Sequence, residues 1–76
     1  MDGYPSRLHY FSAWVVDNTA RGNIKEVTNR FPVYKDVVKS LNFITRNRDK
    51  YPALADSVTY ERVKSFEIGY RNHRYP

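Results

Sequence analysis

The chain has 76 residues, a net charge of +5 and no cysteine, with 41% apolar and 16% aromatic residues. This length suits one small domain, because either half alone would be too short to bury a core. The lack of cysteine excludes disulfides and thiolate metal sites, so stability must come from apolar packing or from a partner. No apolar run is long enough to span a membrane, so we expect a soluble protein of the reducing cytoplasm, with no membrane partner.

The first expected element is a strand from Leu8 to Val16, with the sequence LHYFSAWVV. This run is rich in aromatic and β-branched residues, which favour strands. Both of its faces are largely apolar, which is typical of a strand in the middle of a sheet. The segment DNTARGN follows, and its Gly22 and Asn23 can adopt positive φ, so we interpret it as a hairpin loop.

A second strand is expected from Ile24 to Phe31, and its many polar residues suit the edge of a sheet. Pro32 ends this strand and can serve as an early helical residue, where its missing N–H costs nothing. From Tyr34 to Asp49 the apolar spacing changes to the helical period, which predicts an amphipathic helix of about four turns. The core-facing residues expected on this helix are Val37, Leu41 and Ile44.

The last predicted strand runs from Val58 to Ile68. The side chains expected on one of its faces are Val58, Tyr60, Phe66 and Ile68. Val63 falls on the other face, so the strand is expected to contain a bulge. A short helix beginning after Ser57 is the alternative interpretation of this segment.

These elements predict an α+β domain, with a three-stranded, mainly antiparallel sheet in ββαβ order and one amphipathic helix on one face. A right-handed crossover places the third strand beside the first and gives the spatial order 2-1-3. The domain is expected to cover residues 1–68, followed by a basic, flexible tail at residues 69–76. Because one helix covers only one side of a sheet, the other side is expected to meet a partner or a second copy in a homodimer.

Catalytic and metal-binding patterns are absent from the sequence. The two histidines, His9 and His73, have no second histidine or carboxylate at ligand spacing, and the three glycines are isolated from one another. No serine stands in a nucleophile elbow. We therefore expect no enzyme, no cofactor and no metal. A small ribonuclease that relies on one histidine and Arg71 is the remaining catalytic alternative.

The positive charge is concentrated in the second half of the chain. Residues 1–38 carry five Lys/Arg against four Asp/Glu, and residues 39–76 carry eight against four. Basic clusters attract phosphates or acidic protein surfaces, and Tyr and Arg are common at binding interfaces. The candidate partner-binding residues are Arg21, Lys25, Arg46, Arg48, Lys50, Tyr70, Arg71, Arg74 and Tyr75. Cations near a helix C-terminus are also stabilised by the helix dipole, which gives Arg46, Arg48 and Lys50 a purely structural explanation.

The order of the expected elements resembles that of the small ββαβ proteins of bacteriophage early regions, which often begin with a Tyr-Phe strand. The resemblance covers residues 9–68, through HYFSAWVV, a glycine-containing turn, one helix and SVTYERVKSFEIG. It implies a protein that binds and redirects a host enzyme or a defence complex. No functional residue is carried over from that group.

Two functions remain open from the sequence. The first is a non-enzymatic protein-binding module, such as an inhibitor or modulator of a host enzyme. The second is a basic nucleic-acid-binding domain, although the sequence lacks the aromatic signature of an RRM and the GXXG loop of a KH domain. An accessory subunit of a larger assembly is a further possibility.

Overall fold

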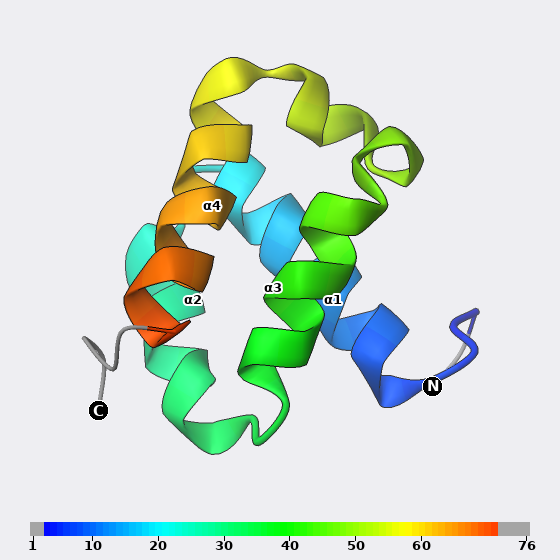
Figure 1. The fold of residues 1–76 in the computed structure, drawn as a ribbon, viewed down its shortest axis with the longest axis vertical. Helices are drawn as coiled ribbons and strands as arrows, with labels where there is room; N and C mark the ends of the chain where they lie inside the picture. Colours follow the sequence, from blue (N-terminus) through cyan, green and yellow to red (C-terminus); the bar gives the residue numbers. More distant parts are fainter. Residues whose placement is uncertain (1–2, 72–76) are drawn as a thin grey trace.

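The computed structural model describes residues 3–71, and its regular secondary structure is helical throughout that range (Figure 1). The α-helices are α1 (Arg7–Ala20), α2 (Ile24–Arg30), α3 (Val37–Arg46) and α4 (Ser57–Arg71). The 3-10 segments are η1 (Phe31–Val33), η2 (Arg48–Lys50) and η3 (Pro52–Ala55). The predicted α+β fold with a three-stranded ββαβ sheet is therefore wrong, because residues 3–71 contain no strand.

Helix α1 occupies the segment in which the sequence predicts the central strand. Its buried residues recur at helical spacing and are Phe11, Ser12, Val15, Val16 and Thr19. Ser6 caps the helix from an extended conformation, and its Oγ accepts a hydrogen bond of 3.3 Å from the backbone N–H of His9. The burial of one complete helical face outweighs the modest preference of aromatic and β-branched residues for strands.

The turn after α1 ends a helix and does not connect two strands. Gly22 has φ +84°, and its N–H donates to the carbonyl oxygen of Thr19 at 3.1 Å. The N–H of Asn23 donates to the carbonyl oxygen of Asn18 at 2.9 Å. This pair of bonds is the Schellman motif, which satisfies the last carbonyls of a helix. Gly22 has the positive φ that the sequence allows, but Asn23 has φ −82°, and the predicted hairpin is wrong.

Helix α2 and segment η1 replace the predicted edge strand. Val27 of α2 and Phe31 of η1 are buried, and α2 packs mainly against α1. Pro32 lies in the first turn of η1, the early helical position expected for it. The single turn of η1 then directs Tyr34 back toward α1.

Helix α3 lies where the sequence predicts a helix, with Val37, Leu41 and Ile44 buried as expected. It is shorter than predicted, and it packs against α4 and α1 instead of a sheet. Figure 1 shows α3 beside α4, with α1 crossing behind α3. Ser12 Oγ of α1 donates to the backbone carbonyl oxygen of Ser40 in α3 at 3.5 Å, so small residues let these two helices approach closely.

Helix α4 lies where the third strand was predicted, so that strand is wrong. The alternative prediction, a helix beginning after Ser57, gives the correct type of element. Val58 and Ile68, expected on the same face of a strand as Phe66, are 53% exposed, whereas Phe66 is buried. Val63, expected on the opposite face, is fully buried. Asp56 caps this helix by accepting hydrogen bonds from the N–H and the Oγ1 of Thr59, at 3.1 and 2.9 Å.

The core lies between the helices and draws on every α-helix. Its buried apolar members are Phe11, Val15, Val16, Val27, Phe31, Val37, Leu41, Ile44, Leu54, Val63 and Phe66. The expectation of a homodimer was based on an uncovered sheet face, and that face does not exist in residues 3–71. Among the described helices, none is long and apolar enough to cross a membrane.

Candidate functional site

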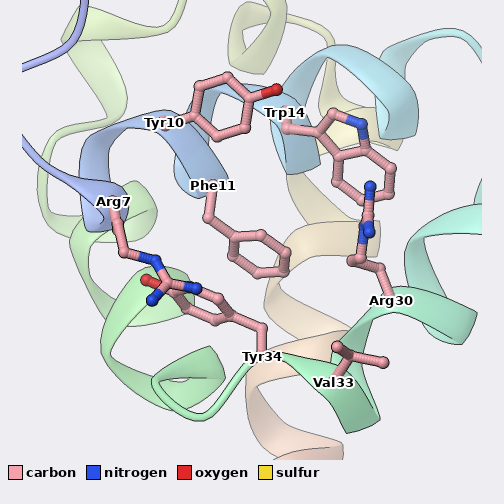
Figure 2. A pocket seen from close by; sticks show the side chains of 7 residues that line it. All are labelled: Arg7, Tyr10, Phe11, Trp14, Arg30, Val33 and Tyr34. Atoms are coloured by element: carbon pink, nitrogen blue, oxygen red, sulfur yellow. The ribbon is translucent and has the colours of Figure 1, made fainter. Parts of the chain in front are cut away.

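A pocket opens between α1 and the segment that joins α2 to α3 (Figure 2). Its volume is about 200 Å³. The residues that line it are Arg7, Tyr10, Phe11, Trp14, Arg30, Val33 and Tyr34. The lining is therefore aromatic in its centre and carries two arginines.

One face of α1 supplies four of these residues. Arg7, Tyr10, Phe11 and Trp14 follow the spacing i, i+3, i+4 and i+7, which places them on one side of a helix. Val33 and Tyr34 face them from the end of η1. The pocket thus depends on the helical form of α1, because a strand would point Phe11 away from Tyr10 and Trp14.

The floor of the pocket is a stack of rings centred on Phe11. The Phe11 and Tyr34 rings lie 3.9 Å apart between centroids with an interplanar angle of 14°, and Phe11 and Trp14 lie 5.9 Å apart at 17°. Phe11 is only 6% exposed, whereas Tyr10 is 47% and Val33 is 74% exposed. A buried, stacked floor with an exposed apolar rim provides a preformed surface for another apolar group.

Both arginines of the pocket are exposed to solvent. The Cζ of Arg30 lies 5.4 Å from the centroid of the Trp14 ring, within the range of a cation–π interaction. No ion pair of Arg7 or Arg30 occurs among residues 3–71, and no Asp or Glu lines the pocket. The electrostatic character of the pocket is therefore positive.

The structure assigns internal contacts to several of the predicted partner-binding residues. Arg21 forms an exposed ion pair with Asp17 at 3.3 Å. The Cζ of Arg48 lies 3.8 Å from the centroid of the Tyr60 ring, and its Nη2 donates to the carbonyl oxygen of Leu54 at 3.3 Å. Arg21 and Arg48 therefore have structural roles that require no ligand.

The predicted residues near the end of the chain belong in part to α4. Gly69, Tyr70 and Arg71, expected in a flexible tail, form the last residues of this helix. Tyr70 packs edge-on against the buried Phe31 ring at 5.0 Å. Arg71 pairs with the 9%-exposed Glu67 carboxylate at 3.4 Å and donates to Asn42 Oδ1 at 2.6 Å. Both side chains therefore help to hold α4 in place.

The last two predicted residues, Arg74 and Tyr75, lie outside the described residues, as does His73.

A shallow hollow brings together two of the predicted basic residues, Arg46 and Arg48. Its remaining lining residues are Asp49, Tyr51, Pro52 and Ala55. Burial raises the pKa of the Tyr51 hydroxyl, although a hydrogen bond with Ser12 acts in the opposite direction. Lys50 is exposed and does not line this hollow, and Lys25 is exposed on α2. The carboxylate of Asp49 offsets part of the positive charge here.

His9 has a packing role. Its ring lies 4.8 Å from the Phe43 ring, and its Nδ1 is 2.6 Å from Ser6 Oγ. Within residues 3–71 no group of three or more His, Cys, Asp or Glu side chains could hold a metal ion. The position of His9 in a helix cap and against an aromatic ring explains it without a catalytic role.

None of the seven pocket residues is among the partner-binding residues predicted from the sequence. Four of them could have been identified from the i, i+3, i+4, i+7 spacing of Arg7, Tyr10, Phe11 and Trp14, preceded by Ser6 as a helix cap. This spacing is visible only if the segment is taken as a helix.

Comparisons with known proteins give no match: no family model, no curated protein and no solved structure is similar to this chain at a significant level. The ββαβ order on which the resemblance to phage early-region proteins depends is also absent from residues 3–71. The functional interpretation therefore depends on the pocket alone.

Proposed function

We propose that this chain is a small helical protein-binding module, and that its aromatic pocket receives one large apolar side chain of a partner protein. The observation that carries the proposal is the arrangement of three partly exposed aromatic side chains, Tyr10, Trp14 and Tyr34, around the buried Phe11. Trp, Tyr and Arg are the residues that contribute most often to binding energy at protein interfaces. All three types meet in this pocket.

The size of the pocket supports a side chain as its occupant. Its volume of about 200 Å³ lies below the roughly 300–1,000 Å³ of most small-molecule sites. Its floor is fixed, because Phe11 is packed between Tyr34 and Trp14 and contacts the buried Phe31 ring. A rigid aromatic surface loses little conformational entropy when a partner binds.

A nucleic-acid partner has weaker support. Binding to single strands needs a continuous basic groove in addition to rings for stacking. Three arginines of the expected basic surface are already engaged within the chain: Arg21 with Asp17, Arg48 with Tyr60, and Arg71 with Glu67. The pocket itself offers two guanidinium groups, which suit a local contact better than binding along the phosphates of a nucleic-acid backbone.

The proposal can be tested by selecting peptides from a random library on the immobilised protein. The dissociation constants of the selected peptides are then measured for wild type and for two variants, Val33→Gln and Val58→Gln. Val33 lines the pocket and is 74% exposed, whereas Val58 is 53% exposed on α4 and does not line it. The same chemical change is thus made inside and outside the site, at positions where the fold should tolerate it.

We expect Val33→Gln to weaken binding about tenfold, the effect of roughly 1.4 kcal/mol at an interface. Val58→Gln should bind as wild type does. Peptides that bind both variants equally well would show that the pocket is not the binding site. A selection that yields no peptide with an apolar anchor would contradict the proposed function itself.

A further inference from the structure

Arg7 and Arg30 lie on opposite sides of the pocket. Figure 2 shows Arg7 on the side of Tyr34 and Arg30 on the side of Trp14, with the Phe11 ring between them. They come from different elements, the first turn of α1 and the last turn of α2. A side chain that enters the pocket therefore has a guanidinium group on each side.

Helix stability does not explain the position of Arg7. A cation in the first turn of a helix lies at the positive end of the helix dipole, where it is unfavourable. Helix α1 has no acidic residue in its first turn that would offset this charge. Within residues 3–71 Arg7 also has no ion pair. The Arg7 guanidinium therefore has no anionic partner within these residues and is available to an anion of a partner.

Arg30 lies over the ring of Trp14, its neighbour in the pocket lining. Its guanidinium lies over the Trp14 ring with 5.4 Å between Cζ and the ring centroid. Arg30 is exposed and has no ion pair within residues 3–71, so its guanidinium N–H groups can donate to a partner. An arginine can pair with both oxygens of one carboxylate, so Arg30 can hold a carboxylate of the partner at this side of the pocket.

We infer that the partner segment is acidic, with one large apolar side chain flanked on both sides by Asp or Glu. This inference rests on the proposed function and adds the charge pattern of the partner. The apolar side chain fills the space above Phe11, and the flanking carboxylates pair with Arg7 and Arg30. The match is one of charge complementarity, because no carboxylate within residues 3–71 lines the pocket.

The test uses four fluorescently labelled peptides of equal length and the complete chain. The first has a central Phe with Glu on both sides, the second replaces the Glu residues with Gln, the third replaces them with Lys, and the fourth keeps Glu but replaces Phe with Ala. Binding is measured by fluorescence anisotropy at low and at high salt. A single-stranded oligonucleotide with the same label serves as the nucleic-acid probe.

We expect the Glu-flanked Phe peptide to bind at least tenfold more tightly than the Gln-flanked one, and its advantage to shrink at high salt. Arg7→Glu and Arg30→Glu should each weaken binding of the Glu-flanked Phe peptide and improve binding of the Lys-flanked one. The control variant is Arg62→Glu, which changes the net charge equally at an exposed position of α4 outside the pocket. It should behave as wild type does.

Three outcomes would overturn the inference. Equal binding of the Glu- and Gln-flanked Phe peptides would refute the acidic pattern and leave the proposed function standing. Failure of all three Phe peptides to bind would contradict the proposed function as well. Tighter binding of the oligonucleotide, with a steep salt dependence that Arg7→Glu and Arg30→Glu remove, would assign the pocket to nucleic acid.

Discussion

The Phe11 ring of α1 stacks on the Tyr34 ring after η1, with centroids 3.9 Å apart and planes 14° apart. This contact joins the first helix to the connection between α2 and α3. It also forms the floor of the pocket, so the same two rings contribute to the stability of the fold and to the shape of the site.

We predict that this stacking contributes measurably to stability. In a double-mutant cycle with Phe11→Leu, Tyr34→Leu and the double variant, the coupling energy should be about 0.5–1.5 kcal/mol, the range for aromatic pairs. Urea denaturation followed by circular dichroism measures each free energy of unfolding. Effects that simply add would show that the two rings do not interact in solution.

The helical form of residues 7–20 could not be recognised from residue preference. The run LHYFSAWVV contains the residue types that favour strands, and this preference is the basis of the strand predicted there. The structure instead follows the spacing of Phe11, Val15 and Thr19, which one helical face buries. Because a run of mostly apolar residues fits both periods, the decisive information lay in its ends, with Ser6 before the helix and Gly22 after it.

The same ambiguity affected the last helix. Val58 and Ile68 match the period of a strand, but both are exposed, and Val63 is buried in the core. In contrast, the spacing of Val37, Leu41 and Ile44 fits only a helix, and α3 was predicted in the right place. The complete pocket was not predicted, because it needs α1 to be a helix and Tyr34 to return to it from a segment expected to follow a strand.

Gly22 provides a test of how α1 ends. Its φ of +84° is one that residues with a Cβ rarely adopt, while a Cβ added there would meet no atom within 4 Å. Gly22→Ala should therefore lower the free energy of unfolding by about 1–2 kcal/mol through backbone conformation alone. Thermal unfolding of Gly22→Ala and Gly22→Asn gives the comparison. Asn tolerates this conformation better and should cost less, so an equal loss for both variants would contradict the explanation.

The Asp56 cap of α4 makes the stability of the fold depend on pH. Hydrogen bonds from the Thr59 side chain and backbone lower the pKa of Asp56 below its usual value. The folded chain therefore favours the ionised carboxylate, and this stabilisation is complete above the unfolded pKa and is lost as the pH falls through the folded pKa. The melting temperature of Asp56→Asn should be lower than that of wild type at neutral pH, and the difference should shrink in acid. A difference that is constant down to low pH would refute this role.

Arg48 is predicted to stabilise the fold and to have no direct role in binding. Its guanidinium covers the Tyr60 ring and holds the carbonyl oxygen of Leu54. Arg48→Ala should lower stability by about 0.5–1 kcal/mol, as expected for a cation–π contact near the surface. Lys50→Ala, at the exposed end of the same segment, should change it by less than about 0.5 kcal/mol. Chemical denaturation measures the free energy of unfolding of both variants. An equal decrease for both would show that the contacts of Arg48 with Tyr60 and Leu54 do not stabilise the fold.

The central claim is that a partner side chain enters the pocket above Phe11. The most direct measurement is a set of intermolecular NOEs between the isotope-labelled protein and a bound peptide with a single apolar anchor. The claim predicts NOEs from the anchor side chain to the rings of Tyr34 and of Trp14, the chain's one tryptophan. NOEs from the anchor to exposed residues of α4, such as Val58 or Ile68, with none to the Tyr34 and Trp14 rings, would contradict it.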